Sequence, residues 1–179
     1  MIINNIISKY RILNVIRKLF TYIYSMYSKE FIKETKTLFY TSFGVFMRKH
    51  KSLESKKIKW VNYPTYVKNI FLRIHADTKV ARVQIDFQQK DPEIRSLFFE
   101  QFKELKNIFH TTQNEEWNWE ENYTSEFGIE WSRVYIEIEN INIYNKENWK
   151  EIFEFFESKL LKFDEFWNEF FELFKQLED

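Results

Sequence analysis

Asp77, Asp86 and Lys90 are the side chains whose spacing comes nearest to that of a metal-dependent nuclease. Such a site holds a metal ion between carboxylates on neighbouring strands, and a lysine activates water or stabilises charge. The spacing departs from that pattern, because Gln88 stands where the lysine is required. Asp77 also suits a hairpin turn, and Asp86 suits the wet face of a strand. We therefore expect a protein that binds rather than catalyses, with this trio as the catalytic alternative.

A second group of polar side chains alternates along the predicted strands 69–76, 80–87 and 129–139. Arginine presents a planar fork to phosphate or carboxylate, and tyrosine or tryptophan can stack on a base. The alternative is a half-exposed sheet face with ordinary cross-strand pairs. The candidate binding residues are Trp60, Arg73, Arg82, Gln84, Arg133 and Tyr135, and the alternation places Phe71, His75 and Asp86 on the same face.

The charges of the chain are unevenly divided although their total is balanced. The first 90 residues hold 18 Lys and Arg against 5 Asp and Glu, and the remainder hold 9 against 22. This division indicates two surfaces of opposite sign or two halves that attract each other. The densest basic run is either a row of phosphate-binding charges or a solvated loop. It consists of Arg48, Lys49, Lys51, Lys56, Lys57 and Lys59.

Several classes of site are excluded by composition. The chain has no cysteine, which excludes disulfides, thiolate zinc sites, iron–sulfur clusters and a cysteine nucleophile. Its two glycines, Gly44 and Gly128, cannot form a glycine-rich phosphate loop. His50, His75 and His110 have no second ligand at metal-binding spacing, so we expect neither a metal nor a cofactor.

Residues 1–25 differ from the rest, since they contain no acid and mix isoleucine with four basic residues. The uncharged stretches are too short to cross a bilayer, so we expect no stable membrane insertion and a cytoplasmic location. The segment fits either a basic amphipathic helix on a membrane surface or an extension outside the domain. Met26 would then be the start, with Ser28 as a helix N-cap. We expect residues 26–179 to form a single domain.

The pattern of apolar residues predicts an α+β fold. It comprises an antiparallel sheet of about five to six strands, packed against an N-terminal helix, a central helix and C-terminal aromatic-rich helices. The predicted strands are 57–63, 69–76, 80–87, 116–123 and 129–139, and the predicted helices are 29–49, 91–109 and a region from Asn145 onward with a break near 158–160.

Two helices carry the residues expected to form the core. In the central helix the inward residues are Ile94, Leu97, Phe98, Phe102, Leu105 and Ile108. The C-terminal region has one inward series and a second aromatic stripe of Phe155, Phe166 and Phe171. A second stripe exceeds what one core requires, so it could meet a second copy or another protein. The alternative is that the N-terminal helix covers it.

Several stretches of residues 26–175 resemble, in order, a bacterial family known as domain of unknown function 4268. They include Ile58-Lys59-Trp60-Val61-Asn62-Tyr63, Asp91-Pro92-Glu93-Ile94, Leu97-Phe98-Phe99-Glu100-Gln101-Phe102, Ser132-Arg133-Val134-Tyr135 and Asp164-Glu165-Phe166-Trp167. The resemblance implies an α+β domain without an assigned activity. In longer relatives a similar domain follows a nuclease-like domain, which implies an association with nucleic acid by analogy.

Three functions follow as hypotheses. The first is an accessory module that contacts nucleic acid or a nucleic-acid enzyme. The second is a protein–protein or homodimerisation module that uses the C-terminal aromatic helices. The third is a divergent metal-dependent nuclease.

Overall fold

A computed structural model describes residues 28–53 and 57–178 of the chain. The contacts between its Cα atoms divide the chain into two compact units, with the boundary between Leu38 and Phe39. The prediction of one domain over residues 26–179 stays a prediction.

Helix α2 (Lys29–Phe46) contains the boundary between the two units. Its first turn begins as predicted, because the Oγ atom of Ser28 accepts a hydrogen bond from the backbone N–H of Phe31 at 3.0 Å. The interpretations of residues 1–25 lie outside the described residues. None of the helices that the structure describes is long and apolar enough to cross a membrane.

The unit from Phe39 onward contains a four-stranded antiparallel sheet. Its strands are β1 (Ile70–Ala76), β2 (Val80–Phe87), β3 (Asn118–Thr124) and β4 (Glu130–Glu139). They lie in the order β1-β2-β4-β3, so β1 and β3 form the two edges. The predicted hairpin and the α+β class are confirmed. The described part of the sheet has four strands, whereas about five to six were expected.

The prediction of a strand over 57–63 is wrong, because this segment forms a 3₁₀ turn, η2 (Trp60–Asn62). The backbone N–H of Asn62 donates to the carbonyl of Lys59 at 2.9 Å. Lysines alternate with apolar residues in this stretch, which is the spacing typical of a strand. The buried side chains Trp60 and Tyr63 are three residues apart, however, and one 3₁₀ turn places them on the same side.

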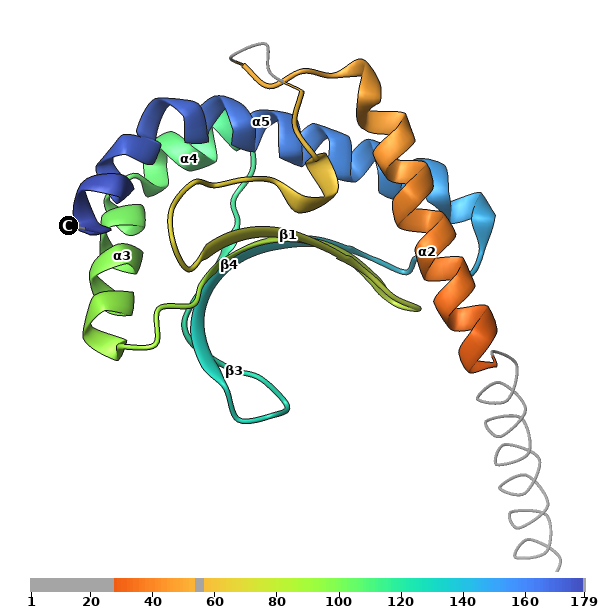
Figure 1. The fold of residues 1–179 in the computed structure, drawn as a ribbon, viewed down its shortest axis with the longest axis horizontal. Coiled ribbons are helices and arrows are strands. Elements are labelled where there is room, and N and C mark those ends of the chain that lie inside the picture. The colour runs from red at the N-terminus through yellow and green to blue at the C-terminus, as the bar shows by residue number, and fades with distance from the viewer. Residues whose placement is uncertain (1–27, 54–56, 179) are drawn as a thin grey trace, which may run out of the picture. The chain divides into compact units, whose positions relative to one another are not determined.

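The helices of this unit lie on one face of the sheet. They are α3 (Pro92–Glu104), α4 (Lys106–Gln113) and α5 (Trp149–Lys175). Figure 1 shows all three along the outer side of the curved sheet, with no helix of this unit on the opposite side. We call the two sides the covered face and the open face.

Local sequence patterns predicted where a helix begins, but they did not predict where a helix is interrupted. The Asp91 carboxylate caps α3 as predicted, accepting from the backbone N–H of Glu93 at 2.9 Å. The predicted single helix 91–109 is divided at Leu105 into α3 and α4. The break expected near 158–160 is absent. Lys159 and Leu160 are buried, and α5 continues through them.

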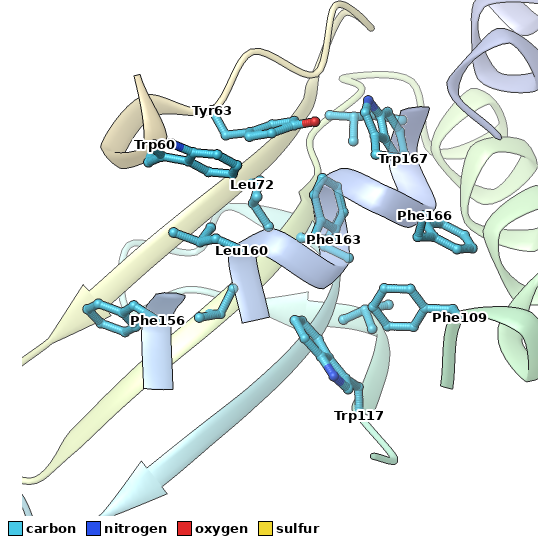
Figure 2. Close-up of a cluster of buried hydrophobic side chains, with 14 of the residues drawn as sticks. Trp60, Tyr63, Leu72, Phe109, Trp117, Phe156, Leu160, Phe163, Phe166 and Trp167 are labelled. Carbon is cyan, nitrogen blue, oxygen red and sulfur yellow. The ribbon is translucent and has the colours of Figure 1, made fainter. Parts of the chain in front are cut away.

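Aromatic side chains from several elements pack together on the covered face. Figure 2 shows Tyr63, Phe109, Phe163, Phe166 and Trp167 converging from a loop, α4 and α5. Their rings meet edge to face or stacked, which is the favourable geometry for aromatic pairs.

The inward series predicted for the central helix was wrong at three positions. Ile94, Leu97 and Ile108 are exposed, because α3 and α4 present a neighbouring stripe to the sheet. That buried stripe consists of Phe98, Phe99, Phe102, Leu105 and Phe109.

The second aromatic stripe of the C-terminal region is not a free surface. Phe166 is 1% exposed and packs against Phe102 and Phe109. Phe155 and Phe171 are half-buried against the same core. One core within this unit therefore uses both stripes of α5, and the extra aromatic residues do not require a second copy.

Candidate functional site

The open face of the sheet collects polar side chains in rows across the strands. Successive side chains of a strand point to opposite faces, and cross-strand partners point to the same face. Asp86 on β2 is paired with Phe71 on β1 and Arg133 on β4. Glu120 on β3 completes that row. The next row holds Arg73, Gln84, Tyr135 and Asn118, and the row after it holds His75, Arg82 and Glu137.

Asp86 is the centre of a buried network on this face. Its side chain is 1% exposed. Its Oδ1 atom accepts hydrogen bonds from Trp131 Nε1 at 3.1 Å and Arg133 Nε at 3.0 Å. Its Oδ2 atom accepts from Arg73 Nη1 at 2.6 Å and Gln84 Nε2 at 2.9 Å. Four donors thus occupy both oxygens, and the two guanidinium groups exceed the one carboxylate by one positive charge.

Each arginine of this face lies over an aromatic ring, which is a favourable cation–π arrangement. The Arg133 guanidinium carbon lies 3.8 Å from the centre of the Tyr123 ring and 5.2 Å from that of Trp131. The corresponding distances are 4.3 Å for Arg73 over Phe71 and 4.8 Å for Arg82 over Tyr135.

The network has a deep part and an accessible part. The side chain of Arg133 is 5% exposed, whereas that of Arg73 is 41% exposed. Arg82 is intermediate and forms an ion pair with Glu137, with 2.6 Å between Nη2 and Oε2. Arg133 and Asp86 therefore position the face, and Arg73 and Arg82 are the arginines that a ligand can reach.

Tyr135 is held in its neutral form on this face. Burial raises the pKa of its hydroxyl, and the neighbouring carboxylates of Glu120 and Glu137 raise it further. The hydroxyl donates a hydrogen bond to Glu120 Oε1 at 3.4 Å. Tyr135 thus offers a neutral ring beside the guanidinium group of Arg82, which is suitable for stacking.

The family of this chain is established by comparison with known proteins. A family model, the domain of unknown function DUF4268, matches residues 35–171. The chain belongs to this family. No curated protein and no solved structure matches it. The DUF4268 match includes all four strands and therefore the whole open face.

The structure of this DUF4268 domain brings together five of the six candidate binding residues. Arg73, Arg82, Gln84, Arg133 and Tyr135 share the open face. Trp60 does not join them. Its ring is 4% exposed within the core of the covered face, beside Tyr63 in Figure 2, and its Nε1 donates to the carbonyl of His50 at 3.5 Å.

Two aromatic residues of the site were missed. Trp131 alternates with Arg133 and Tyr135, so the strand period was sufficient to find it. Tyr123 reaches the Arg133 guanidinium from β3, past an irregularity in the pairing between Glu120 and Tyr123. Such a shift is not visible in the alternation of a sequence.

The three residues of the catalytic alternative lie at opposite ends of β2. Asp77 lies beside Val80 at the start of β2 and Asp86 is close to its end, which places them about 20 Å apart along the strand. Asp77 Oδ1 instead accepts from the backbone N–H groups of Lys79 and Val80 in the hairpin turn. Burial acts to raise the pKa of Asp77, but these hydrogen bonds hold it below its usual value. Lys90 is exposed beyond β2.

No group of three His, Asp or Glu side chains among the described residues could hold a metal ion. The described histidines have other partners. His50 Nε2 lies 2.6 Å from Glu157 Oε1, and His75 Nε2 lies 3.2 Å from Asp77 Oδ2. His110 Nε2 accepts from the indole N–H of Trp119 at 3.1 Å.

The basic run lies away from the open face. Lys49 forms an ion pair with Glu157 on α5 at 2.8 Å, on the covered side of the sheet. Arg48, Lys51, Lys57 and Lys59 are exposed, and Lys56 lies outside the described residues. The Lys49–Glu157 and Arg82–Glu137 pairs each join a cation of the basic half to an acid of the acidic half. The two halves of the sequence therefore do attract each other at these points.

Proposed function

We propose that this protein is a non-catalytic module that binds single-stranded nucleic acid across the open face of its sheet. The observation that carries the proposal is the set of arginine–aromatic pairs at 3.8–4.8 Å on a sheet face that no helix of the unit covers. Guanidinium planes and aromatic rings stack on unpaired bases, and each such contact contributes about 1–3 kcal/mol.

The electrostatics of the face favour an anionic ligand at one place. The two guanidinium groups exceed the Asp86 carboxylate by one positive charge, and the carboxylate of Glu120 lies in the same row beside the deep Arg133. The accessible guanidinium group belongs to Arg73. A phosphate or a base edge can accept hydrogen bonds from the outer part of that group. The flanking Phe71 ring is also exposed, so a base and its phosphate could be held together.

The same network argues against catalysis on this face. Asp86 accepts four hydrogen bonds and is buried, so its carboxylate is occupied in fixing the arginines. A general base requires a carboxylate that can reach the substrate. The proposal therefore assigns Asp86 a positioning role in binding.

Fluorescence anisotropy of the full chain with short labelled single-stranded DNA and RNA, over a salt series, tests the proposal. We expect binding that weakens linearly in logarithmic affinity with logarithmic salt concentration. Arg73→Gln and Arg82→Gln should each weaken binding about tenfold, which corresponds to about 1.4 kcal/mol.

Two variants that also replace one positively charged side chain with glutamine serve as controls. Lys150 is 85% exposed on α5, and Lys150→Gln should leave the affinity unchanged. Lys59→Gln removes a charge from the basic run. If Lys59→Gln weakens the affinity and Arg73→Gln does not, the nucleic acid binds to the basic run instead of the open face. If the chain binds no nucleic acid at low salt, the proposal of nucleic-acid binding is refuted.

A further inference from the structure

The outer edge of β1 contains a short length of backbone whose hydrogen-bonding groups are unpaired within this unit, although Leu72 as a whole residue is only 4% exposed. The backbone N–H of Gln88 donates to the carbonyl of Asn69 at 2.7 Å, and that of Asp77 donates to Val80 at 3.0 Å. These two bonded pairs lie at opposite ends of one uninterrupted antiparallel register. Bonded and non-bonded pairs alternate in such a ladder, so the odd-numbered residues of β1 bond to β2. The even-numbered residues direct their N–H and C=O groups away from the sheet.

The two ends of this edge are satisfied within the unit. Ile70 donates its N–H to the carbonyl of Val67 at 3.4 Å and accepts from Thr65 Oγ1 at 2.7 Å. The N–H of Ala76 donates to the hydroxyl of Tyr40 at 3.2 Å. Between them, the outward N–H and C=O groups of Leu72 and Ile74 have no hydrogen-bond partner among the described residues from Phe39 onward.

A groove runs along this unpaired edge. It has a volume of about 420 Å³ and is lined by residues 71–74 of β1, by residues 61–63 opposite them and by Tyr40 at one end. Figure 1 shows the segment that contains η2 passing beside β1. A neighbouring strand lies about 4.8 Å from its partner, so a strand added to this edge would have to enter the groove.

The groove continues into a second one lined only by neutral and basic side chains. The second groove, of about 290 Å³, shares Tyr40, Val61 and Asn62 with the first. Arg48 and Lys59 line it, and Arg73 lines the first groove. No acidic side chain of the described residues lines either groove, so the two together favour an acidic occupant.

We propose that the edge of β1 is a docking site for an extended acidic peptide of a partner protein, which adds to the sheet as a fifth strand. The free groups of Leu72 and Ile74 recur at the two-residue spacing of a polypeptide in β-strand addition. The positive charges of Arg48, Lys59 and Arg73 then select acidic side chains. Natural sheets usually block or pair such an edge, which makes an unpaired one beside a groove informative.

The first groove shares Phe71 and Arg73 with the open face, so its test uses residues that only the grooves contain. Asn62 and Lys59 line the grooves, and neither belongs to the open face. The probe is a short peptide of alternating glutamate and valine, compared with a lysine–valine peptide and with a glutamate–valine peptide that has a proline at its centre. Peptide binding is measured by fluorescence anisotropy, and amide exchange of the full chain is measured by NMR.

The expected result is binding of the glutamate–valine peptide alone, with amide exchange of Leu72 and Ile74 slowed about tenfold or more. Asn62→Trp fills the shared part of the grooves and should weaken binding by at least about tenfold, whereas Asn107→Trp on the exposed side of α4 should not. Lys59→Glu should also weaken it, and the lysine–valine peptide should then bind better.

Three results would overturn the proposal. The first is peptide binding without protection of Leu72 and Ile74. The second is binding that Asn62→Trp leaves unchanged. The third is protection of these two amides in the free protein that increases with its concentration, because a second copy would then occupy the edge.

Discussion

The centres of both faces of the sheet are shielded from solvent, but different forces stabilise the side chains on each face. On the covered face, Phe87 and Phe102 are 0% exposed and their rings lie 5.5 Å apart. On the open face, Asp86 is 1% exposed and is bonded to four donors. Apolar packing has no preferred direction, whereas a charge-assisted network tolerates only one arrangement of its donors. The open face therefore gains a fixed geometry suited to recognition.

The largest effect is expected from a truncation on the covered face. Phe102 contacts aromatic rings from β2, β3, α4 and α5. Phe102→Ala removes these contacts and leaves a cavity, so the free energy of unfolding should fall by about 4 kcal/mol. Urea denaturation measures it. Leu97→Ala, on the exposed side of the same helix, should change it by less than about 0.5 kcal/mol.

The contribution of the charged network on the open face is tested by removing the carboxylate of Asp86. Asp86→Ala leaves two guanidinium groups uncompensated and should cost about 3 kcal/mol. Asp86→Leu combined with Arg133→Met should be clearly more stable than Asp86→Ala, because the buried charge of Arg133 is then removed as well. Arg73 is 41% exposed and can turn to water. If the double variant is as unstable as Asp86→Ala in urea denaturation, apolar packing and not charge dominates this face.

A smaller effect is expected where one histidine joins α4 to β3 on the covered face. His110 Nε2 accepts from the backbone N–H of Trp117 at 3.2 Å and from Trp119 Nε1 at 3.1 Å. His110→Leu leaves both donors unpaired and should cost about 1–2 kcal/mol at neutral pH, as measured by urea denaturation.

The same residue predicts a pH dependence. Burial lowers the pKa of His110, the nearby Lys106 lowers it further and Glu116 opposes them. The unfolded chain therefore binds the proton more readily, so this stabilisation is complete above pH 6.5 and is lost as the pH falls through the lower pKa of the folded state. Thermal unfolding over this range should show the decline in the native chain, and His110→Leu should reduce it. An identical decline in both proteins would contradict the assignment.

The smallest effect is expected at the shallow end of the open face. Arg82 and Glu137 have side chains that are 25% and 22% exposed, so solvent screens their attraction. Glu137→Gln should change the free energy of unfolding by about 0.5 kcal/mol, and added salt should reduce that difference. A cost comparable to that of Asp86→Ala, measured by the same urea titration, would show that the network extends as one unit across the face.

Local patterns were sufficient for much of this fold. The alternation in 69–76 and 80–87 predicted which residues share a face, and that face is as predicted. Asp91 predicted the start of α3 through its capping carboxylate. Both signals act between residues that are close in the chain, so they can be read without knowing the rest of the structure.

The sequence by itself determined the α+β class, the hairpin and the residue types of the open face, because strand period and helix caps are local properties. Tertiary structure decided that Trp60 belongs to the core, where it lies in one cluster with side chains of the distant helix α5. It also decided that Tyr123 reaches Arg133 and that residues 61–63 stand opposite the unpaired edge of β1. These are contacts between segments far apart in the chain, and only packing selects among the many pairs that the sequence permits.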